Sequence, residues 1–279
     1  MNNEMDLFSN VNHTDDNEDL PAINVNTSSD DLLDYMVIVI TRRLQVTKAF
    51  KGGYLLNQLL HEHSRATHDV DFSIDDVQNY ESVKEVLIDI GESFKKLGII
   101  TSFVVKENIS PTSSGGIDFY ESDGRKILGV DVGLHPLVQG ITSYDFKIAT
   151  FNGFTVERML SDKTIAILSR KRFRRTKDIY DFWVITNYFD VDLDTLSKMI
   201  IERGNAEWDN IPFNEDVIRE YKRAWDKLQL VEYRTGAALF KPDFNEVIDR
   251  FYAVVTPVKA GKTGVFWNHK EGCVFKKNV

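Results

Sequence analysis

Two short stretches, Lys51-Gly52-Gly53-Tyr54 and Asp69-Val70-Asp71, decide which fold this sequence predicts. The Gly-Gly pair stands where a short apolar strand is expected to end and a helix to begin. Glycine at such a junction lets the backbone approach an anion, and the N–H groups of the following helix can bind phosphate. The stretch lacks the Gly-Lys-Ser/Thr and Gly-x-Gly-x-x-Gly patterns, so a P-loop or a dinucleotide-binding fold is not expected.

Asp69 and Asp71 are expected to lie on one face of a strand, because residues i and i+2 of a strand point the same way. Two carboxylates held this close repel each other unless a cation neutralises them, and hard oxygen ligands favour Mg²⁺ or Mn²⁺. We predict Asp131 as the third carboxylate ligand, with Asp118 and Asp145 as competitors. A solvated strand face is the alternative for an isolated Asp-x-Asp pattern, but the Gly-Gly pair favours a triphosphate and metal site.

Arg65 and Thr67 precede the two aspartates. The Arg65 guanidinium can bind a phosphate or brace the carboxylates, and a purely structural salt bridge is an equal alternative. The Thr67 hydroxyl can assist the same site or be modified. His68, with His61 and His63, does not form a spacing typical of a zinc site.

The composition is that of a soluble globular protein, with 42% apolar and 28% charged residues in a chain of 279. A single cysteine, Cys273, excludes an intramolecular disulfide and suits a reducing compartment. The longest apolar run, residues 35–40, is far too short to span a bilayer, and the N-terminus lacks the apolar run of a secretory signal. We therefore expect a cytoplasmic protein that has no membrane partner.

Acidic residues are concentrated at the N-terminus. Residues 1–31 hold eight of the 43 acidic side chains and none of the 34 basic ones. We expect a disordered acidic tail here, because the segment is polar and poor in aromatic residues. It is either a solvated leader or a partner-binding or autoinhibitory segment. Since the tail carries much of the net charge of −9, the acidic total does not argue against a nucleic-acid partner.

Residues 32–156 predict an α+β domain with a mixed or antiparallel sheet. Hydrophobic periodicity predicts helices at 54–61 and 81–97, and another helix that begins after Ser29 or Asp30. Strands are predicted at 49–51, 69–74, 99–105, 116–121, 126–134, 143–150 and 154–156. Hairpin turns are predicted at 122–125 and at Asn152-Gly153.

Residues 157–279 predict a helical C-terminal domain. The pattern changes near residue 156, after which helices are predicted at 157–171, 177–189, 192–203, 215–228 and 243–254. Beyond Pro257, a short terminal hairpin is predicted from residues 264–267 and 273–276. The change of pattern makes residue 156 the expected domain boundary.

A second group of chemically suited residues lies in this helical part. Lys163 can hold a nucleotide phosphate as a point charge. Asp178 and Asp181 share a helix face, and one of them can position Lys163 or a substrate group. Six of the eight residues 170–177 are basic, namely Arg170, Lys171, Arg172, Arg174, Arg175 and Lys177. This density suits a triphosphate or an RNA backbone, and a solvated basic turn between helices is the alternative.

These residues resemble the nucleotidyltransferase-like toxins of the abortive-infection AbiEii/AbiGii family, whose fold is of the DNA polymerase β type. The family's first signature is Lys-Gly-Gly, a short helix and Arg-x-(Ser/Thr)-x-Asp-x-Asp. Lys51-Gly52-Gly53 and Arg65-Ala66-Thr67-His68-Asp69-Val70-Asp71 are similar to it. The second signature, a helix-opening lysine followed by Arg/Lys-Asp-hydrophobic-Tyr-Asp, is similar to Lys163 and Lys177-Asp178-Ile179-Tyr180-Asp181. The resemblance marks residues 32–156 as a nucleotidyltransferase-like domain.

The resemblance implies a metal-dependent transfer of nucleotides from an NTP to an RNA acceptor, in related toxins the 3′ end of tRNA, which halts translation. A cognate antitoxin would restrain the enzyme. The implied catalytic residues are Asp69, Asp71, Lys163 and Asp178, and the implied Mg²⁺ or Mn²⁺ ligands are Asp69, Asp71 and Asp131. The NTP would contact Gly52, Gly53, Arg65, Thr67 and Lys163, and the RNA would contact the six basic residues of 170–177. A protein or small-molecule acceptor, or a non-catalytic module that binds RNA or a partner, are the alternatives.

Overall fold

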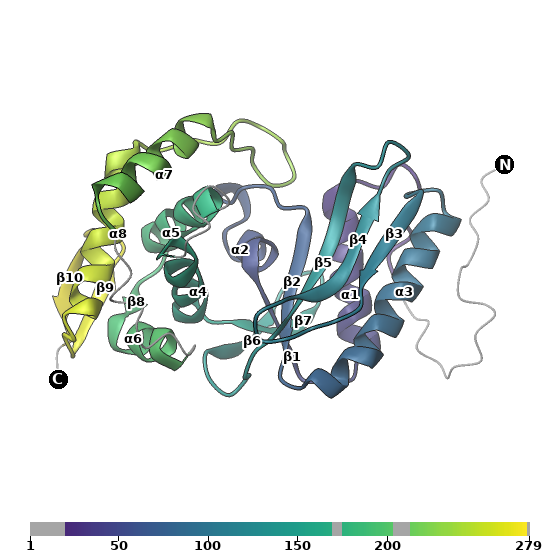
Figure 1. The fold of residues 1–279 in the computed structure, drawn as a ribbon, viewed down its shortest axis with the longest axis horizontal. Helices are drawn as coiled ribbons and strands as arrows, with labels where there is room; N and C mark the ends of the chain where they lie inside the picture. The colour runs from purple at the N-terminus through teal and green to yellow at the C-terminus, as the bar shows by residue number, and fades with distance from the viewer. Residues whose placement is uncertain (1–19, 169–174, 203–212, 278–279) are drawn as a thin grey trace. The chain divides into compact units, whose positions relative to one another are not determined.

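The computed structural model describes residues 20–168, 175–202 and 213–277 (Figure 1). The chain divides into two compact units, each built from separate stretches of sequence. The first contains Met1–Lys48, His68–Pro136 and Asp145–Phe151, and the second contains Ala49–Thr67, Leu137–Tyr144 and Asn152–Val279. The Gly-Gly pair therefore belongs to the second unit and the Asp-x-Asp pair to the first.

Four strands of the first unit form a mixed sheet in the order β3-β4-β5-β2. Their bounds are β2 Asp69–Ile74, β3 Ser102–Lys106, β4 Gly115–Tyr120 and β5 Lys126–Leu134. β2 runs parallel to β5, whereas the pairs β3–β4 and β4–β5 are antiparallel. The β4–β5 hairpin turns where the sequence predicted, with Glu121 N donating to Arg125 O at 3.0 Å and Gly124 at a φ of 78°.

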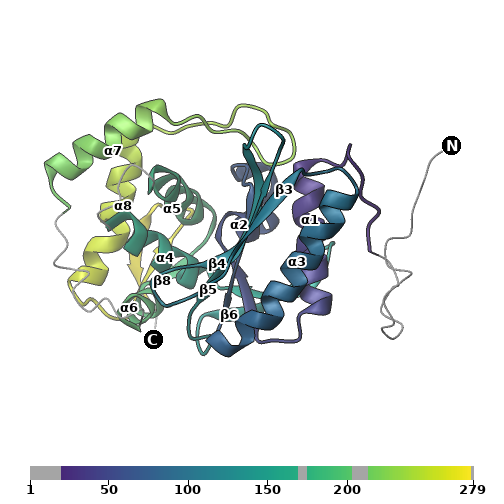
Figure 2. The same cartoon turned by 45° about the vertical axis from the view of Figure 1, so that its right-hand side comes forward.

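Helices α1 (Ser29–Arg43) and α3 (Tyr80–Lys96) lie on one side of these strands, with the short 3₁₀ helix η2 (Val77–Asn79) before α3 (Figures 1 and 2). The side chains of Val70, Phe72 and Ile74 are fully buried. Since side chains alternate along a strand, the opposite face of β2 carries Asp69 and Asp71. The alternation therefore separates an apolar core from a face suited to charge.

Helix α1 begins at Ser29, one or two residues earlier than predicted. Ser28 is its N-cap, because Ser28 Oγ accepts a hydrogen bond from Asp31 N at 3.2 Å. Its buried apolar residues include Leu33, Met36, Val37 and Ile40 on one side, but Tyr35, Ile38 and Val39 are buried as well. Of the predicted acidic tail, residues 1–19 lie outside the described residues.

The second unit contains most residues of three further strands, in the order β1-β7-β6, and most of the described helices. The strands are β1 Lys48–Lys51, β6 Ile141–Asp145 and β7 Thr150–Phe154, and β1 leads into α2 Gly52–Leu60 and the 3₁₀ helix η1 His61–His63. The later helices are α4 Val156–Leu168, α5 Thr176–Tyr188, α6 Leu193–Glu202, α7 Glu215–Lys227 and α8 Phe244–Lys259. β8 Val191–Asp192, β9 Val265–Asn268 and β10 Cys273–Lys276 form a small antiparallel sheet in the order β10-β9-β8.

The predicted hairpin turn at Asn152-Gly153 is wrong. Both residues lie inside β7, which pairs in parallel with β1 through Phe50 and Gly153. A Cβ at residue 153 would stand 3.0 Å from side-chain atoms of Leu55 and Tyr144, so glycine is needed there for close packing and not for a turn. The chain turns earlier, where Phe146 N donates to Ala149 O at 3.2 Å.

Two smaller differences concern the C-terminal part. Helix α8 continues to Lys259 and includes Pro257, whereas the sequence predicted an end at residue 254. Pro257 and Val258 are buried, so packing supports this last turn although proline removes one helix hydrogen bond. The two-residue strand β8, which extends the predicted terminal hairpin to three strands, was not predicted.

The α+β class with a mixed sheet and a largely helical later part is confirmed. The sheet's last strand ends at Phe154 and α4 begins at Val156, where the sequence pattern changes. Residue 156 as a domain boundary stays a prediction. Within the described ranges, none of the helices combines the length and apolar character needed to cross a membrane.

The fold of the first unit requires glycine at position 116, because the backbone there packs directly against the neighbouring strand β5. Gly116 has a φ of 129°, and a Cβ there would collide with Val130 O. Gly124 has a φ of 78°, but a Cβ there would meet nothing within 4 Å. We expect Gly116→Ala to lower the free energy of unfolding by about 3 kcal/mol or more and Gly124→Ala by about 1 kcal/mol, since only the first adds a collision to backbone strain. Urea unfolding of both variants checks this, and equal losses would contradict it.

Candidate functional site

Four carboxylates lie on one face of the first unit's sheet, and we call this set the acid face: Asp69, Asp71, Asp118 and Asp131. The strand register sets their positions. Asp71 is paired with Asp131 across β2 and β5, while Asp69 and Asp118 are both paired with Gly129 from opposite sides. Paired residues of neighbouring strands point to the same face, so the carboxylates form two adjacent rows across three strands.

Two lysines neutralise part of the acid face. Lys126 Nζ lies 2.8 Å from Asp69 Oδ1 and 2.7 Å from Asp118 Oδ1. Lys106 Nζ lies 2.5 Å from Asp131 Oδ1 and 3.3 Å from Asp118 Oδ1. Burial lowers the pKa of each lysine, but the carboxylates outweigh burial and leave both pKa values above the usual range. Both ammonium groups are therefore charged at neutral pH.

Gly129 makes room for this arrangement. A Cβ at residue 129 would stand 2.7 Å from Asp69 Oδ1 and 2.9 Å from both Asp118 Oδ1 and Lys126 Cε. Any side chain at this position would push the charged groups apart. The glycine thus belongs to the construction of the acid face, a role that its place in the sequence does not reveal.

The acid face has the donor chemistry of a site for a hard divalent cation, since three of its carboxylates, on Asp69, Asp71 and Asp131, stand on adjacent parallel strands. In the structure, however, the described residues do not contain three acidic, histidine or cysteine side chains grouped closely enough to hold a metal ion. Lys106 and Lys126 hold Asp131 and Asp69 instead. Asp145, the other predicted competitor, accepts a hydrogen bond from Thr150 Oγ1 at 2.7 Å.

In the second unit, the Gly-Gly pair forms the first two residues of α2, two residues earlier than the predicted helix. Gly52 has a φ of 70°, which favours glycine, and the N-cap residue Lys51 does not cap the helix with its side chain. A Cβ at Gly53 would stand 3.0 Å from Thr67 Oγ1. The glycines therefore let the Thr67 segment lie against the helix N-terminus, where first-turn N–H groups have no partner within the helix.

The segment 64–67 is fixed from two sides. With its amide nitrogen turned toward them, Asn57 donates to Arg65 O at 2.9 Å, Gly53 O at 3.0 Å and Ser64 Oγ at 2.8 Å. On the other side, Ala66 N donates to Val231 O at 2.8 Å and Tyr233 N donates to Ser64 O at 3.1 Å. The position of the Arg65 side chain is therefore set by α2 and by the segment that follows α7.

A network of four charges joins this segment to helices α4 and α5. We call it the charge network: Arg65, Lys163, Asp178 and Asp181. Arg65 donates to both oxygens of Asp181 at 2.8 Å. Lys163 Nζ lies 2.7 Å from Asp178 Oδ1 and 2.7 Å from Asp181 Oδ2. The side chain of Asp181 is only 1% exposed, so its charge is buried with two cations around it.

The pKa values in the charge network follow from these contacts. Burial alone would raise the pKa of Asp181, but Arg65 and Lys163 outweigh it and hold the pKa of Asp181 below its usual value. Burial alone would lower the pKa of Lys163, but Asp178 and Asp181 hold it above the usual range. Lys163 and Asp181 are therefore both ionised at neutral pH.

The residues of both sets match one protein family. Residues 43–251 match the family described as "Nucleotidyl transferase AbiEii toxin, Type IV TA system". This chain belongs to the AbiEii family. It is accordingly a nucleotidyltransferase toxin of a type IV toxin–antitoxin system, with an NTP as substrate and an antitoxin as partner.

Solved structures show similarity at low sequence identity. JHP933 from Helicobacter pylori is 13% identical, with a TM-score of 0.47 over 84% of this chain and 91% of that one. A candidate nucleotidyltransferase from H. pylori is 14% identical, with a TM-score of 0.44 over 84% and 94% of the two chains. An antigenic nucleotidyltransferase-like protein from Paracoccidioides brasiliensis is 15% identical, with a TM-score of 0.36 over 70% and 93%. Among curated proteins, none matches the chain.

The first AbiEii signature supplies Asp69 and Asp71 to the acid face and Arg65 to the charge network, and the second supplies Lys163, Asp178 and Asp181 to the charge network. The predicted metal ligands lie on the acid face, and Lys163 and Asp178 meet in the charge network. Arg65 pairs with Asp181, which is the salt bridge given as the structural alternative. Of the predicted RNA contacts, Arg175 lies 3.5 Å from Asp178 and Lys177 lies in α5. Arg170, Lys171, Arg172 and Arg174 lie outside the described residues.

Sequence reasoning missed Lys106, Lys126 and the central place of Asp181. The i, i+3 spacing of Asp178 and Asp181 signalled a shared helix face, but not that Asp181 binds both cations. The lysines carry no local signal, because only the register of β3, β4 and β5 brings them to the aspartates.

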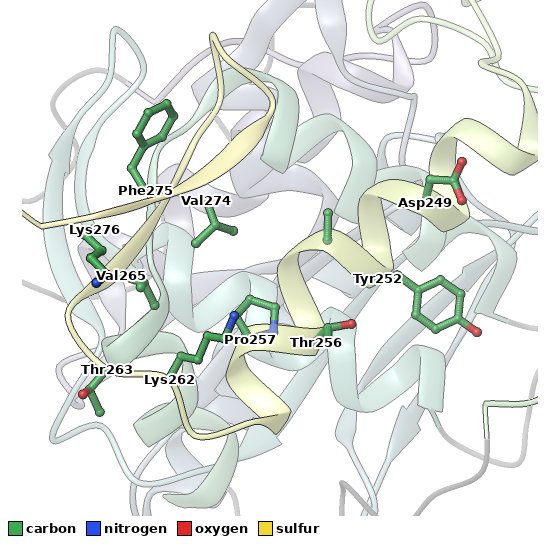
Figure 3. A pocket seen from close by; sticks show the side chains of 11 residues that line it. Asp249, Tyr252, Thr256, Pro257, Lys262, Thr263, Val265, Val274, Phe275 and Lys276 are labelled. Atoms are coloured by element: carbon green, nitrogen blue, oxygen red, sulfur yellow. The ribbon is translucent and has the colours of Figure 1, made fainter.

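An open pocket of ≈ 760 Å³ lies between α8 and the β9–β10 hairpin (Figure 3). Its lining includes the apolar residues Pro257, Val265 and Val274 and the lysines Lys262 and Lys276. None of its lining residues belongs to the acid face or to the charge network. The pocket therefore does not form part of either signature of the AbiEii family.

The charge network predicts a specific dependence of stability on pH. We expect Asp181→Asn to lower the free energy of unfolding by about 3–5 kcal/mol at pH 7, because it leaves Arg65 and Lys163 buried without their shared carboxylate. A carboxylate whose folded pKa is depressed stabilises the fold above its unfolded pKa of about 3.9 and loses this effect as the pH falls through the folded pKa. The difference between wild type and variant should therefore be constant above about pH 4 to 5 and shrink below it.

Urea unfolding at several pH values measures this difference. Asp178→Asn is the matched control, since it removes a partner of Lys163 but leaves Asp181 with both cations. A smaller loss is expected for this control. A difference between wild type and Asp181→Asn that grows on acidification would contradict the assignment.

Proposed function

We propose that this AbiEii-family protein transfers nucleotides from an NTP to the 3′ end of an RNA, with tRNA as the acceptor, and so blocks translation. The observation that carries the proposal is the register of Asp69, Asp71 and Asp131, which stand on one face of adjacent parallel strands. Carboxylates that point to the same side of a sheet can bind a divalent metal ion together, and the metal ion can in turn bind a triphosphate.

The carboxylates of Asp69, Asp71 and Asp131 would hold Mg²⁺ or Mn²⁺. Such an ion neutralises charge on the triphosphate and lowers the pKa of the attacking hydroxyl. The chain's own contribution is to hold these carboxylates on a rigid sheet. Asp69 and Asp131 are about one-third exposed, at 36% and 33% of their side-chain surface, so solvent and substrate can reach them.

The phosphates of the NTP would be held by residues of both signatures, Gly52 and Gly53 of the first and Lys163 of the second. The N-terminus of α2 supplies N–H groups at Gly52 and Gly53. An ammonium group has three donors, and two of those of Lys163 are directed at Asp178 and Asp181. The third suits a phosphate oxygen, so the two aspartates act as positioning residues for Lys163. Arg65 and Thr67 act in the same indirect way, Arg65 through Asp181 and Thr67 through its packing on Gly53.

The acceptor is proposed from charge. The basic residues of 170–177 follow α4, which carries Lys163, and precede Asp178 in α5. Clustered arginine and lysine side chains bind a nucleic-acid backbone and release counterions, so acceptor binding should weaken with salt. A protein or small-molecule acceptor would not need such a segment.

Labelled NTPs test the proposal. Each labelled NTP is incubated with Mg²⁺, the protein and total RNA, or with total protein in place of RNA. We expect label on RNA with wild type, and a loss of about 100-fold or more with Asp69→Asn, because the variant loses a charged ligand to the metal. Asp76→Asn, an exposed acidic residue beyond the end of β2, is the matched control and should keep full activity.

The site of addition is tested in the same assay. Periodate oxidation of the RNA destroys the 3′-terminal diol, so it should abolish labelling if nucleotides are added at that end. Labelling that survives oxidation would exclude the 3′ end. Label found on protein but not on RNA would refute the RNA acceptor, and absence of label with every acceptor would refute the catalytic proposal.

A further inference from the structure

The position of Lys126 on the acid face points to a role beyond neutralising charge. Its Nζ bridges Asp69 and Asp118 at 2.8 and 2.7 Å, and its Cε lies over Gly129, where any Cβ would be 2.9 Å away. Asp69 is one of the residues proposed to bind the metal, whereas Asp118 is not. One ammonium group is thus shared between a proposed metal ligand and a neighbour without that role.

The two carboxylates differ in exposure. The side chain of Asp118 is 16% exposed and that of Asp69 is 36% exposed. Asp118 also contacts Lys106, at 3.3 Å, so it is the carboxylate that both lysines share. The more buried carboxylate has the greater need of a cation, because water compensates its charge less. Asp118 is therefore the partner that a lysine would keep, and Asp69 the partner that it would release.

The charges allow such a release without removing a lysine. The formal charges of the four carboxylates and the two ammonium groups sum to −2, which is equal in magnitude and opposite in sign to the charge of one divalent cation. Lys126 therefore only has to give up its contact with Asp69 and keep its contact with Asp118. No side chain has to leave the face.

Building on the proposed function, we propose that Lys126 is a displaceable counter-ion of Asp69 that competes with the divalent metal for this carboxylate. Asp118 is the residue that retains Lys126 when the contact with Asp69 is broken. Lys126 consequently sets the metal concentration at which the site fills. It restrains the toxin when free divalent metal is scarce, and it does so without contacting the nucleotide.

Binding of Mn²⁺ to the full-length protein without nucleotide tests this role, with free Mn²⁺ measured by electron paramagnetic resonance. We expect Lys126→Met to bind Mn²⁺ about three- to tenfold more tightly, the effect of removing one partly exposed ion pair. Asp118→Asn should bind Mn²⁺ more weakly than wild type, because Lys126 then has Asp69 as its remaining partner. Lys126→Gln should repeat the result of Lys126→Met, and thermal unfolding shows that each variant is folded.

Arg125→Met is the matched control. It removes a positive charge from the neighbouring residue, but Arg125 pairs with Glu121 at 2.5 Å and not with the acid face. We expect its Mn²⁺ affinity to stay within about twofold of wild type. An equal gain in Arg125→Met and Lys126→Met would overturn the proposal, since it would show a general effect of charge.

Asp69→Asn distinguishes an error in the proposed metal site from an error in the proposed role of Lys126. If it does not weaken Mn²⁺ binding, the proposed metal site is wrong and the role of Lys126 is wrong with it. If it weakens binding while Lys126→Met leaves the affinity unchanged, only the role of Lys126 is refuted.

Discussion

Burial of the Asp181 carboxylate is the constraint on which the second unit depends. The side chain is only 1% exposed, and a buried charge is tolerated only when it is paired and hydrogen-bonded. Its partners, Arg65 and Lys163, lie 116 and 18 residues away in the sequence. Satisfying one carboxylate therefore fixes the segment 64–67, α4 and α5 against each other. Arg65 of the first AbiEii signature and Lys163 of the second both bind this one carboxylate.

The acid face obeys the same rule of charge compensation but with a different outcome. Its carboxylates are also held by cations of the chain, Lys106 and Lys126, yet Asp69 and Asp131 are about one-third exposed. Ion pairs at this exposure contribute little to stability, so exchanging one cation for another costs little. The buried charge network thus holds Lys163 in a fixed position. On the acid face, by contrast, the proposed metal ligands have lysine contacts that a metal ion could replace. The difference in burial distinguishes the fixed charge network from the proposed metal site.

The sequence predicted those features that local patterns control. β2 was predicted with its observed bounds because Val70, Phe72 and Ile74 alternate with polar residues, and the 122–125 turn because Gly124 tolerates its positive φ. Non-local packing defeated the prediction at Asn152-Gly153, where pairing with β1 outweighed turn propensity. The lysine contacts could not be predicted for the same reason, since they depend on how three strands align. The pairing of Arg65 with Asp181 was left open because the spacing of residues in the sequence does not show which buried acid an arginine meets.

The central claim is that the acid face exchanges a lysine contact for a metal while the charge network stays intact. The most direct measurement is a crystal structure with Mn²⁺ and a non-hydrolysable NTP analogue, with the metal located by its anomalous scattering. The account predicts Mn²⁺ bound by Asp69 and Asp71, Lys126 in contact with Asp118 alone, and Arg65 and Lys163 still paired with Asp181. Metal bound away from Asp69 and Asp71, or Lys126 still paired with Asp69 beside a bound metal, would contradict it.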